Sequence, residues 1–143
     1  MCCPPGSGAV HTDGPETPVS DITPALGTAT YKGTNTAIGT LTDGKNVTNL
    51  MASPTITANF GAMTTSGVIP YTNVTTGDAG PTFQWNNVPI VGSRYAGAGS
   101  TDTGMTGTVQ AKFVGAGAAA TTGTLAATGN GSSLVGSFAA NKQ

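Results

Sequence analysis

Charged side chains are the scarcest feature of this sequence. Only 8% of its 143 residues are Asp, Glu, Lys or Arg, and the formal net charge is -1. A chain with no basic surface has little with which to neutralise phosphates, so nucleic acid and anionic membrane surfaces are poor partners for it. The length fits one domain.

Cysteine and long apolar runs are almost as scarce. No stretch of about 18 apolar residues occurs, so the sequence contains no candidate transmembrane helix. The two cysteines, Cys2 and Cys3, are adjacent, which excludes a disulfide framework inside the domain. One interpretation of the pair is a terminal tag without a role. The other is lipidation, as in bacterial lipoproteins that begin at an acylated cysteine followed by a polar tether.

Catalytic and metal-binding groups are equally few. His11 is the only histidine, and it lies in a proline-rich segment where a Ser-His-Asp or Cys-His arrangement has no support. The spacing of Cys2, Cys3 and His11 matches no standard zinc pattern. Nothing in the spacing pairs the aspartates Asp43, Asp78 and Asp102. We therefore expect a protein that is not an enzyme and that needs no metal or cofactor.

One glycine-rich motif imitates a nucleotide site. "FVGAGAAA", from Phe113 to Ala120, fits the G-x-G-x-x-A pattern of a dinucleotide-binding turn. That turn needs a helix starting at the second glycine and an acidic residue about 20 positions later. Thr and Gly follow the motif, and no Asp or Glu occurs after Asp102. The motif therefore reflects a glycine- and alanine-rich chain, and nucleotide binding is not expected.

What the sequence has in abundance is threonine and glycine arranged in short runs. Residues 1–24 are rich in Pro and Gly and predict an N-terminal arm or tether, because proline excludes both helix and central strand. Residues 25–143 alternate between apolar and polar positions and are broken by turn residues every 8 to 12 positions or so, which is typical of a sandwich or barrel. The predicted strands are Thr28–Gly33, Thr36–Thr42, Thr55–Phe60, Ser66–Tyr71, Thr82–Asn87, Arg94–Ala98, Gly107–Val114, Thr122–Ala127 and Leu134–Ala139.

Alternation within these strands predicts which face is buried. Ala58 and Phe60 share one side of their strand, and Ala111 and Phe113 share one side of theirs. One apolar and one polar face indicate antiparallel strands around a single core. Glycines inside the strands, such as Gly39, Gly67 and Gly136, fit the close packing of a small barrel. The expected fold is therefore all-β, a single small antiparallel β-barrel of about eight strands with a Pro/Gly-rich N-terminal arm.

Four stretches of the chain resemble the β-barrel domain of the transferrin-binding protein B family, which includes factor H-binding protein-like and haem-binding members. They are "GTATYKG", "ITANFGAMTTSGVI", "TGTVQAKFVGAGAAATTGTL" and "LVGSFAANK". The chain departs from the family in lacking a glutamate and a Gly-Gly pair near Thr122. It also lacks the handle domain and the long charged loops of the large members. The resemblance implies a non-enzymatic barrel that is tethered through its N-terminus at the bacterial cell surface and has haem as a candidate ligand.

Two functions remain open from the sequence. The first is a surface-exposed or extracellular barrel that binds a host protein or a small ligand such as haem through loops 72–81 and 97–107. Its candidate contacts are Tyr71, Trp85, Tyr95 and Asp102, although the aromatic residues fit the barrel core better than an exposed patch. The second is a self-assembling subunit of an extracellular fibre or surface layer. Its arm would pair with a neighbouring copy through Val19, Ile22 and Leu26.

Overall fold

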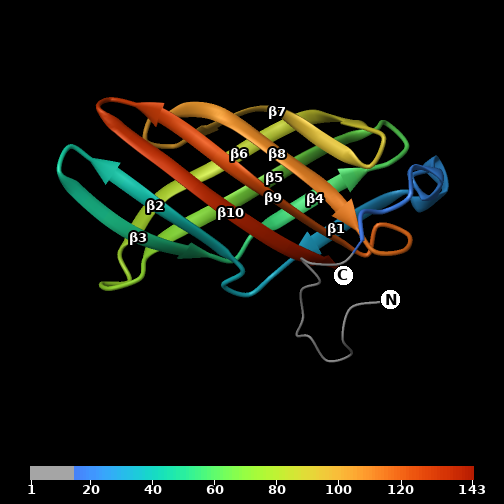
Figure 1. Ribbon diagram of the computed structural model, residues 1–143, viewed down its shortest axis with the longest axis horizontal. Coiled ribbons are helices and arrows are strands. Elements are labelled where there is room, and N and C mark those ends of the chain that lie inside the picture. The colour runs from blue at the N-terminus through green and yellow to red at the C-terminus, as the bar shows by residue number, and fades with distance from the viewer. Residues whose placement is uncertain (1–14) are drawn as a thin grey trace.

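The computed structural model describes residues 15–143, and all of its long elements are antiparallel β-strands (Figure 1). Two short 3-10 turns, η1 (Val19–Asp21) and η2 (Pro24–Leu26), precede the strands. Among the described residues, no helix has the length and apolar character needed to cross a bilayer. The strands are β1 (Thr28–Lys32), β2 (Ala37–Asp43), β3 (Asn46–Ala52), β4 (Thr55–Asn59), β5 (Thr64–Asn73), β6 (Ala79–Val91), β7 (Arg94–Thr101), β8 (Thr106–Val114), β9 (Ala120–Gly129) and β10 (Ser132–Lys142).

The sheet closes on itself. Pairing runs from β1 through β4, β5, β6, β7, β8, β9 and β10, and β10 then pairs back to β1 at Tyr31 and Lys142. Every pairing in this ring of eight strands is antiparallel. The predicted all-β barrel is therefore confirmed. Closure leaves these eight strands with neighbours on both sides, which removes the open edges of a flat sheet.

The hairpin of β2 and β3 completes one half of the wall. β10 pairs with β2 as far as Phe138 and with β1 only from Asn141 onward. In the same way, β5 pairs with β4 as far as Val68 and with β3 from Thr72. The strands β1 and β4 thus fill the wall at one end of the barrel, and β2 and β3 fill it at the other. The sequence did not predict β3, because its asparagines disfavour strands and its apolar residues break strict alternation.

Most connections fall at two opposite ends of the barrel (Figure 1), whereas those at residues 33–36 and 53–54 lie partway along the wall, where β1 and β4 give way to β2 and β3. We call the first end the loop end, and it carries the turns at residues 44–45, 74–78, 102–105 and 130–131. We call the second the arm end, and it carries the connections at residues 60–63, 92–93 and 115–119 together with residues 15–27. The turn at Asn130 and Gly131 has positive φ at both residues, as its Asn-Gly sequence predicts.

Large apolar and aromatic side chains fill the interior. Ala58, Phe60 and Phe113 are fully buried and Ala111 is half-buried, as the alternation predicts. Aromatic rings contact one another along the barrel axis, with centroids 5.2 Å apart for Phe60 and Phe113 and 5.6 Å apart for Trp85 and Phe138. The largest fully enclosed side chains are Tyr31, Phe60, Tyr71, Phe83, Trp85, Tyr95, Phe113 and Phe138.

Inward-facing glycines make room for these rings. A Cβ atom on Gly67 would overlap the six-membered ring of Trp85, and one on Gly136 would overlap the hydroxyl of Tyr71. Gly39 also faces Tyr71, since a Cβ there would lie 3.1 Å from Cε1 of the ring. The interior is therefore packed by placing aromatic rings against bare backbone, on the neighbouring strand for Trp85 and across the barrel for Tyr71.

The polar atoms of the buried aromatic residues are satisfied. Trp85 Nε1 donates to Thr65 Oγ1 at 3.2 Å, and the Tyr71 hydroxyl donates to the Ile38 carbonyl at 3.0 Å. Burial raises the pKa of the hydroxyls of Tyr71 and Tyr95 far above the ordinary value for tyrosine, so both stay neutral. The aromatic core is thus uncharged and hydrogen-bonded, which favours a single packing arrangement.

Residues 15–27 close the arm end of the same barrel. Ile22 and Leu26 pack against the core, and Asp21 Oδ2 accepts a hydrogen bond of 3.0 Å from the backbone of Gly117. The connection at residues 115–119 folds inward, and Ala118 in it is fully buried. Residues 1–14 lie outside the described part, so the predicted boundary between an arm at 1–24 and a barrel at 25–143 stays a prediction.

We predict that Gly67→Ala destabilises the protein by about 1–3 kcal/mol, because the added methyl group must displace the buried Trp85 ring. Chemical denaturation of the variant and the wild type measures the difference. Gly61→Ala is the matched control, since its Cβ would meet only the exposed Asn59 side chain, at 3.3 Å. Equal stability of Gly67→Ala and the wild type would contradict the packing described.

Candidate functional site

The aromatic residues predicted as candidate contacts lie inside the barrel. Tyr71, Trp85 and Tyr95 are exposed by 1%, 2% and 2% respectively, so they form no surface patch. Trp85 stacks on Tyr95 with centroids 6.3 Å apart. An eight-stranded barrel is wide enough either for side chains or for one small ligand, and here aromatic side chains occupy that space. Binding surfaces must therefore be sought on the outside.

The loop end carries a small hollow at the mouth of the barrel. Its volume is about 220 Å³. Apolar side chains from different strands and loops form part of the lining, namely Leu41, Pro81 and Met105, and polar residues surround them, namely Asp43, Thr103, Asn130 and Ser132. An apolar centre with a polar rim is the composition expected of a protein-binding surface.

Hydrogen bonds fix the loops around this hollow. Asp102 Oδ1 accepts a bond of 2.9 Å from the backbone of Thr82, which ties the connection at 102–105 to β6. Asn130 Nδ2 donates to the Thr103 carbonyl at 3.2 Å, and Ser132 Oγ donates to Asp43 Oδ1 at 3.2 Å. The candidate contact Asp102 is thus exposed, and its side chain also holds the loop in place through the hydrogen bond from Thr82. Loops held in this way lose little conformational entropy on binding.

The loop at residues 74–78 is preorganised by its own side chains. Asn73 Oδ1 accepts hydrogen bonds of 2.8 and 3.1 Å from the backbones of Thr75 and Thr76. Val74 at its start is 51% exposed. Both loops named from the sequence, 72–81 and 97–107, therefore have their turns at the same end of the barrel, where one partner can contact them together.

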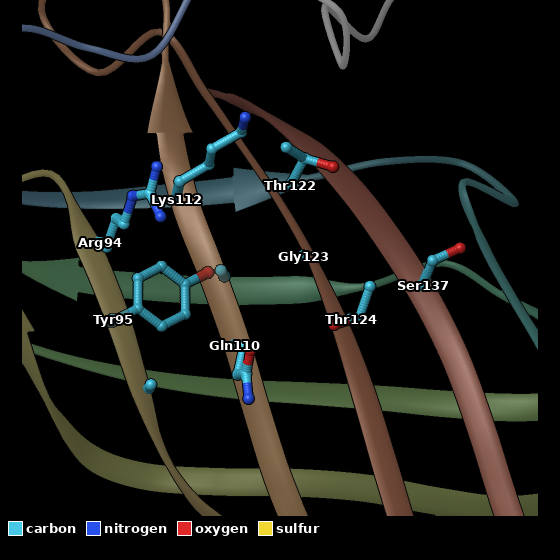
Figure 2. Close-up of a pocket in the computed structure, with 10 residues that line it drawn as sticks. Arg94, Tyr95, Gln110, Lys112, Thr122, Gly123, Thr124 and Ser137 are labelled. Atoms are coloured by element: carbon cyan, nitrogen blue, oxygen red, sulfur yellow. The ribbon is translucent and has the colours of Figure 1, made fainter.

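A second, larger hollow lies on the outer wall of β7, β8, β9 and β10 (Figure 2). It is open to solvent and has a volume of about 550 Å³. Small residues such as Ala96 and Gly123 leave the wall thin here, whereas Arg94 and Lys112 stand near its arm end. The other polar residues that line it are the buried Tyr95, Gln110, Thr122, Thr124 and Ser137.

Arg94 is engaged by an ion pair with the arm. Its guanidinium binds the Glu16 carboxylate through two hydrogen bonds, of 2.8 Å from Nη2 and 3.0 Å from Nε. Ser93 Oγ donates a further bond to the same carboxylate. These hydrogen bonds lower the pKa of Glu16 from its ordinary value of 4.5 to about 2, so the carboxylate is ionised at neutral pH. The pair joins residues 78 positions apart, and no pattern in the sequence indicates it.

The described residues show no metal-binding cluster. Within residues 15–143, no three His, Cys, Asp or Glu side chains come together to hold a metal ion. The lipidation candidates Cys2 and Cys3, and also His11, lie outside the described residues. The glycine-rich motif from Phe113 to Ala120 joins β8 and β9 through a loop with no helix.

The candidate arm contacts are divided between core and solvent. Ile22 and Leu26 pack against the chain's own barrel, whereas Val19 is 62% exposed. Val19–Asp21 and Pro24–Leu26 form 3-10 turns, whereas pairing with a neighbouring copy was predicted to use an extended strand. Contacts of residues 15–27 with a second chain stay untested.

Comparison with known proteins identifies the fold. No protein-family model matches the chain, and no curated protein matches it. Among solved structures, it is similar to a double mutant of transferrin-binding protein B from Haemophilus parasuis (18% identity, TM-score 0.69). It is also similar to HpuA from Kingella denitrificans in complex with human haemoglobin (19%, 0.63) and to a structure described as a surface lipoprotein (15%, 0.57).

These similarities cover most of this chain and only part of the others. The matches span 90% of this chain with 28% of the transferrin-binding protein, and 90% with 48% of HpuA. For the surface lipoprotein they span 95% of this chain and 66% of the other. The resemblance drawn from the sequence is confirmed at the level of the fold, and this chain spans only part of these larger proteins.

We predict that Trp85 fluorescence resists quenching by acrylamide in the folded protein, because the indole lies within the barrel. Trp85 is the only tryptophan, so the signal needs no deconvolution. Stern-Volmer measurements in buffer and in denaturant test this, and the unfolded chain provides the control for full exposure. Equally strong quenching in both states would mean that the ring faces water.

Proposed function

We propose that this chain is a non-enzymatic barrel that binds another protein through its loop end at the bacterial cell surface. The observation that carries the proposal is the filled interior, because aromatic rings occupy the space in which an eight-stranded barrel would enclose a small ligand. The loop end instead offers a shallow apolar hollow with a polar rim and loops fixed by hydrogen bonds. Such a surface suits a macromolecular partner.

Proteins of similar fold support a host protein as the partner. One is described as a transferrin-binding protein and another was solved in complex with human haemoglobin. Haem itself is a weaker candidate than a protein. A haem site needs an enclosed pocket and an axial ligand, and the tyrosines Tyr31, Tyr71 and Tyr95 are held inside the packed core.

A lipid anchor would hold the barrel at the surface. Cys2 or Cys3 supplies the thiol, and the following Pro/Gly-rich segment supplies a tether. A similar fold occurs in a surface lipoprotein. We predict that mass spectrometry of protein from a bacterial host with its lipoprotein-processing pathway shows acyl chains on one of these cysteines. A Cys2→Ser/Cys3→Ser variant is the control, and unmodified cysteines in the wild type would contradict an anchor.

Self-assembly through the arm is not favoured by any feature of the described residues. That function requires the arm to add to a neighbouring copy, and the described part of the arm contacts its own barrel. A binding barrel with an anchored N-terminus therefore remains the proposed function.

Binding through the loop end is tested with immobilised protein and purified serum proteins, transferrin and haemoglobin included, by biolayer interferometry. We predict that a Lys45→Glu/Val74→Arg variant weakens binding at least about tenfold, because both side chains lie on exposed loop-end segments and a changed charge at an interface is costly.

The matched control is Lys32→Glu/Val68→Arg, which makes the same substitutions at exposed positions of β1 and β5 on the outer wall. We expect it to leave binding unchanged. If only the control variant weakened binding, the binding site would lie on the outer wall and not at the loop end. Absence of binding to every serum protein tested would contradict the proposed function.

A further inference from the structure

β8 extends beyond its neighbour β7 at the arm end. β7 begins at Arg94, which pairs with Lys112, whereas β8 continues to Val114. The Phe113 amide still donates to the carbonyl of Ser93, just before β7, at 2.8 Å, and beyond that bond β8 has no β7 residue beside it. A strand edge left in this way offers backbone donors and acceptors to any extended segment.

The chain's own arm occupies this edge. The amide of Thr17 donates to the Phe113 carbonyl at 2.8 Å, and the amide of Gly115 donates to the Pro15 carbonyl at 2.9 Å. Between them, Glu16 lies opposite Val114 in an antiparallel bridge. The arm thus adds a very short strand to β8, in line with β7. This is the geometry of β-strand addition by a peptide.

Side chains around the exposed end of β8 determine which extended segment can pair with it. Ser93 and the guanidinium of Arg94 hold the Glu16 carboxylate, and Lys112 contributes favourable charge. On the other side, Thr17 is 1% exposed and its hydroxyl donates to the Gly115 carbonyl at 2.7 Å. The edge therefore accepts an extended segment with an acidic residue followed by a small hydroxyl residue.

The arm holds this position through few contacts. Proline at positions 15 and 18 has no backbone N–H, so the arm cannot lengthen the ladder through those residues. The Arg94 and Glu16 side chains are 68% and 32% exposed, and ion pairs so open to water contribute little to stability. At positions 15–17, a competing segment has to replace two backbone hydrogen bonds, the side-chain bonds made by the Thr17 hydroxyl and by Ser93, and an exposed ion pair.

We propose that the β8 edge, with its clamp of Ser93 and Arg94, is a docking site for an extended acidic segment of a partner protein, and that residues 15–17 are its built-in occupant. Charge complementarity argues for this partner, since the clamp presents Arg94 and Lys112 to a carboxylate. In the free protein the arm lowers the apparent affinity of the site for a partner segment, because only the fraction of molecules in which residues 15–17 have left β8 can bind it. The site lies at the arm end and does not depend on binding at the loop end.

The experiment uses the full chain and a labelled peptide, Asp-Gly-Val-Glu-Thr-Val-Val, measured by fluorescence anisotropy. A Glu16→Gln/Thr17→Pro variant removes the carboxylate and the amide that hold the arm. We expect it to bind the peptide about tenfold more tightly than the wild type does. Glu16→Gln alone keeps the backbone pairing and should give a smaller gain, which preserves the test if the double variant fails to fold.

Two matched controls address the clamp. A peptide with Gln in place of Glu, and an Arg94→Gln substitution added to the opened variant, should each weaken binding about threefold, because each removes a charged pair that is largely open to water. Equal binding of the Glu and Gln peptides would overturn the proposal, as would equal affinity of the wild type and both opened variants. Dimerisation of the opened variant without peptide binding would show that the occupant is a second copy's arm, which would overturn the proposed partner.

Discussion

The packing of aromatic rings against bare glycine backbone is the constraint on which this structure depends. Trp85 covers Gly67, and Tyr71 covers Gly136 from the opposite part of the wall. Each ring is large and each facing residue has no side chain, so the two layers meet without overlap. A chain with few large aliphatic residues thereby fills the interior of a closed barrel.

A filled interior determines where function can reside. Ligands cannot be enclosed as in barrels with an open lumen, so recognition falls to the outer wall and the two ends. The ends differ in their construction. Residues 15–27 and the connection at 115–119 close the arm end, whereas the turns at the loop end stand around a small hollow. The same scaffold therefore offers a displayed surface at one end and an occupied strand edge at the other.

Period-two alternation predicted the fold class, most strands and the buried faces of Phe60 and Phe113, because burial on one face of a strand leaves a direct mark on the sequence. The role of Gly67 and Gly136 in close packing was also predicted. Alternation does not predict which aromatic ring contacts which glycine, because those contacts depend on the register between strands and on which strands face each other across the barrel. It also missed β3, whose asparagines disfavour strands and whose apolar residues break alternation, and the pairing of Glu16 with Arg94, which joins residues 78 positions apart.

The most direct measurement of the central claim is the proton chemical shift of the glycine Hα atoms under the rings. If Trp85 packs face to backbone on Gly67, ring currents must move the Gly67 Hα resonances well away from their random-coil positions. The account predicts such a displacement for Gly67, its loss in a Trp85→Leu variant that remains folded, and random-coil-like values for the exposed Gly61. Random-coil shifts at Gly67 in the folded wild type would contradict it.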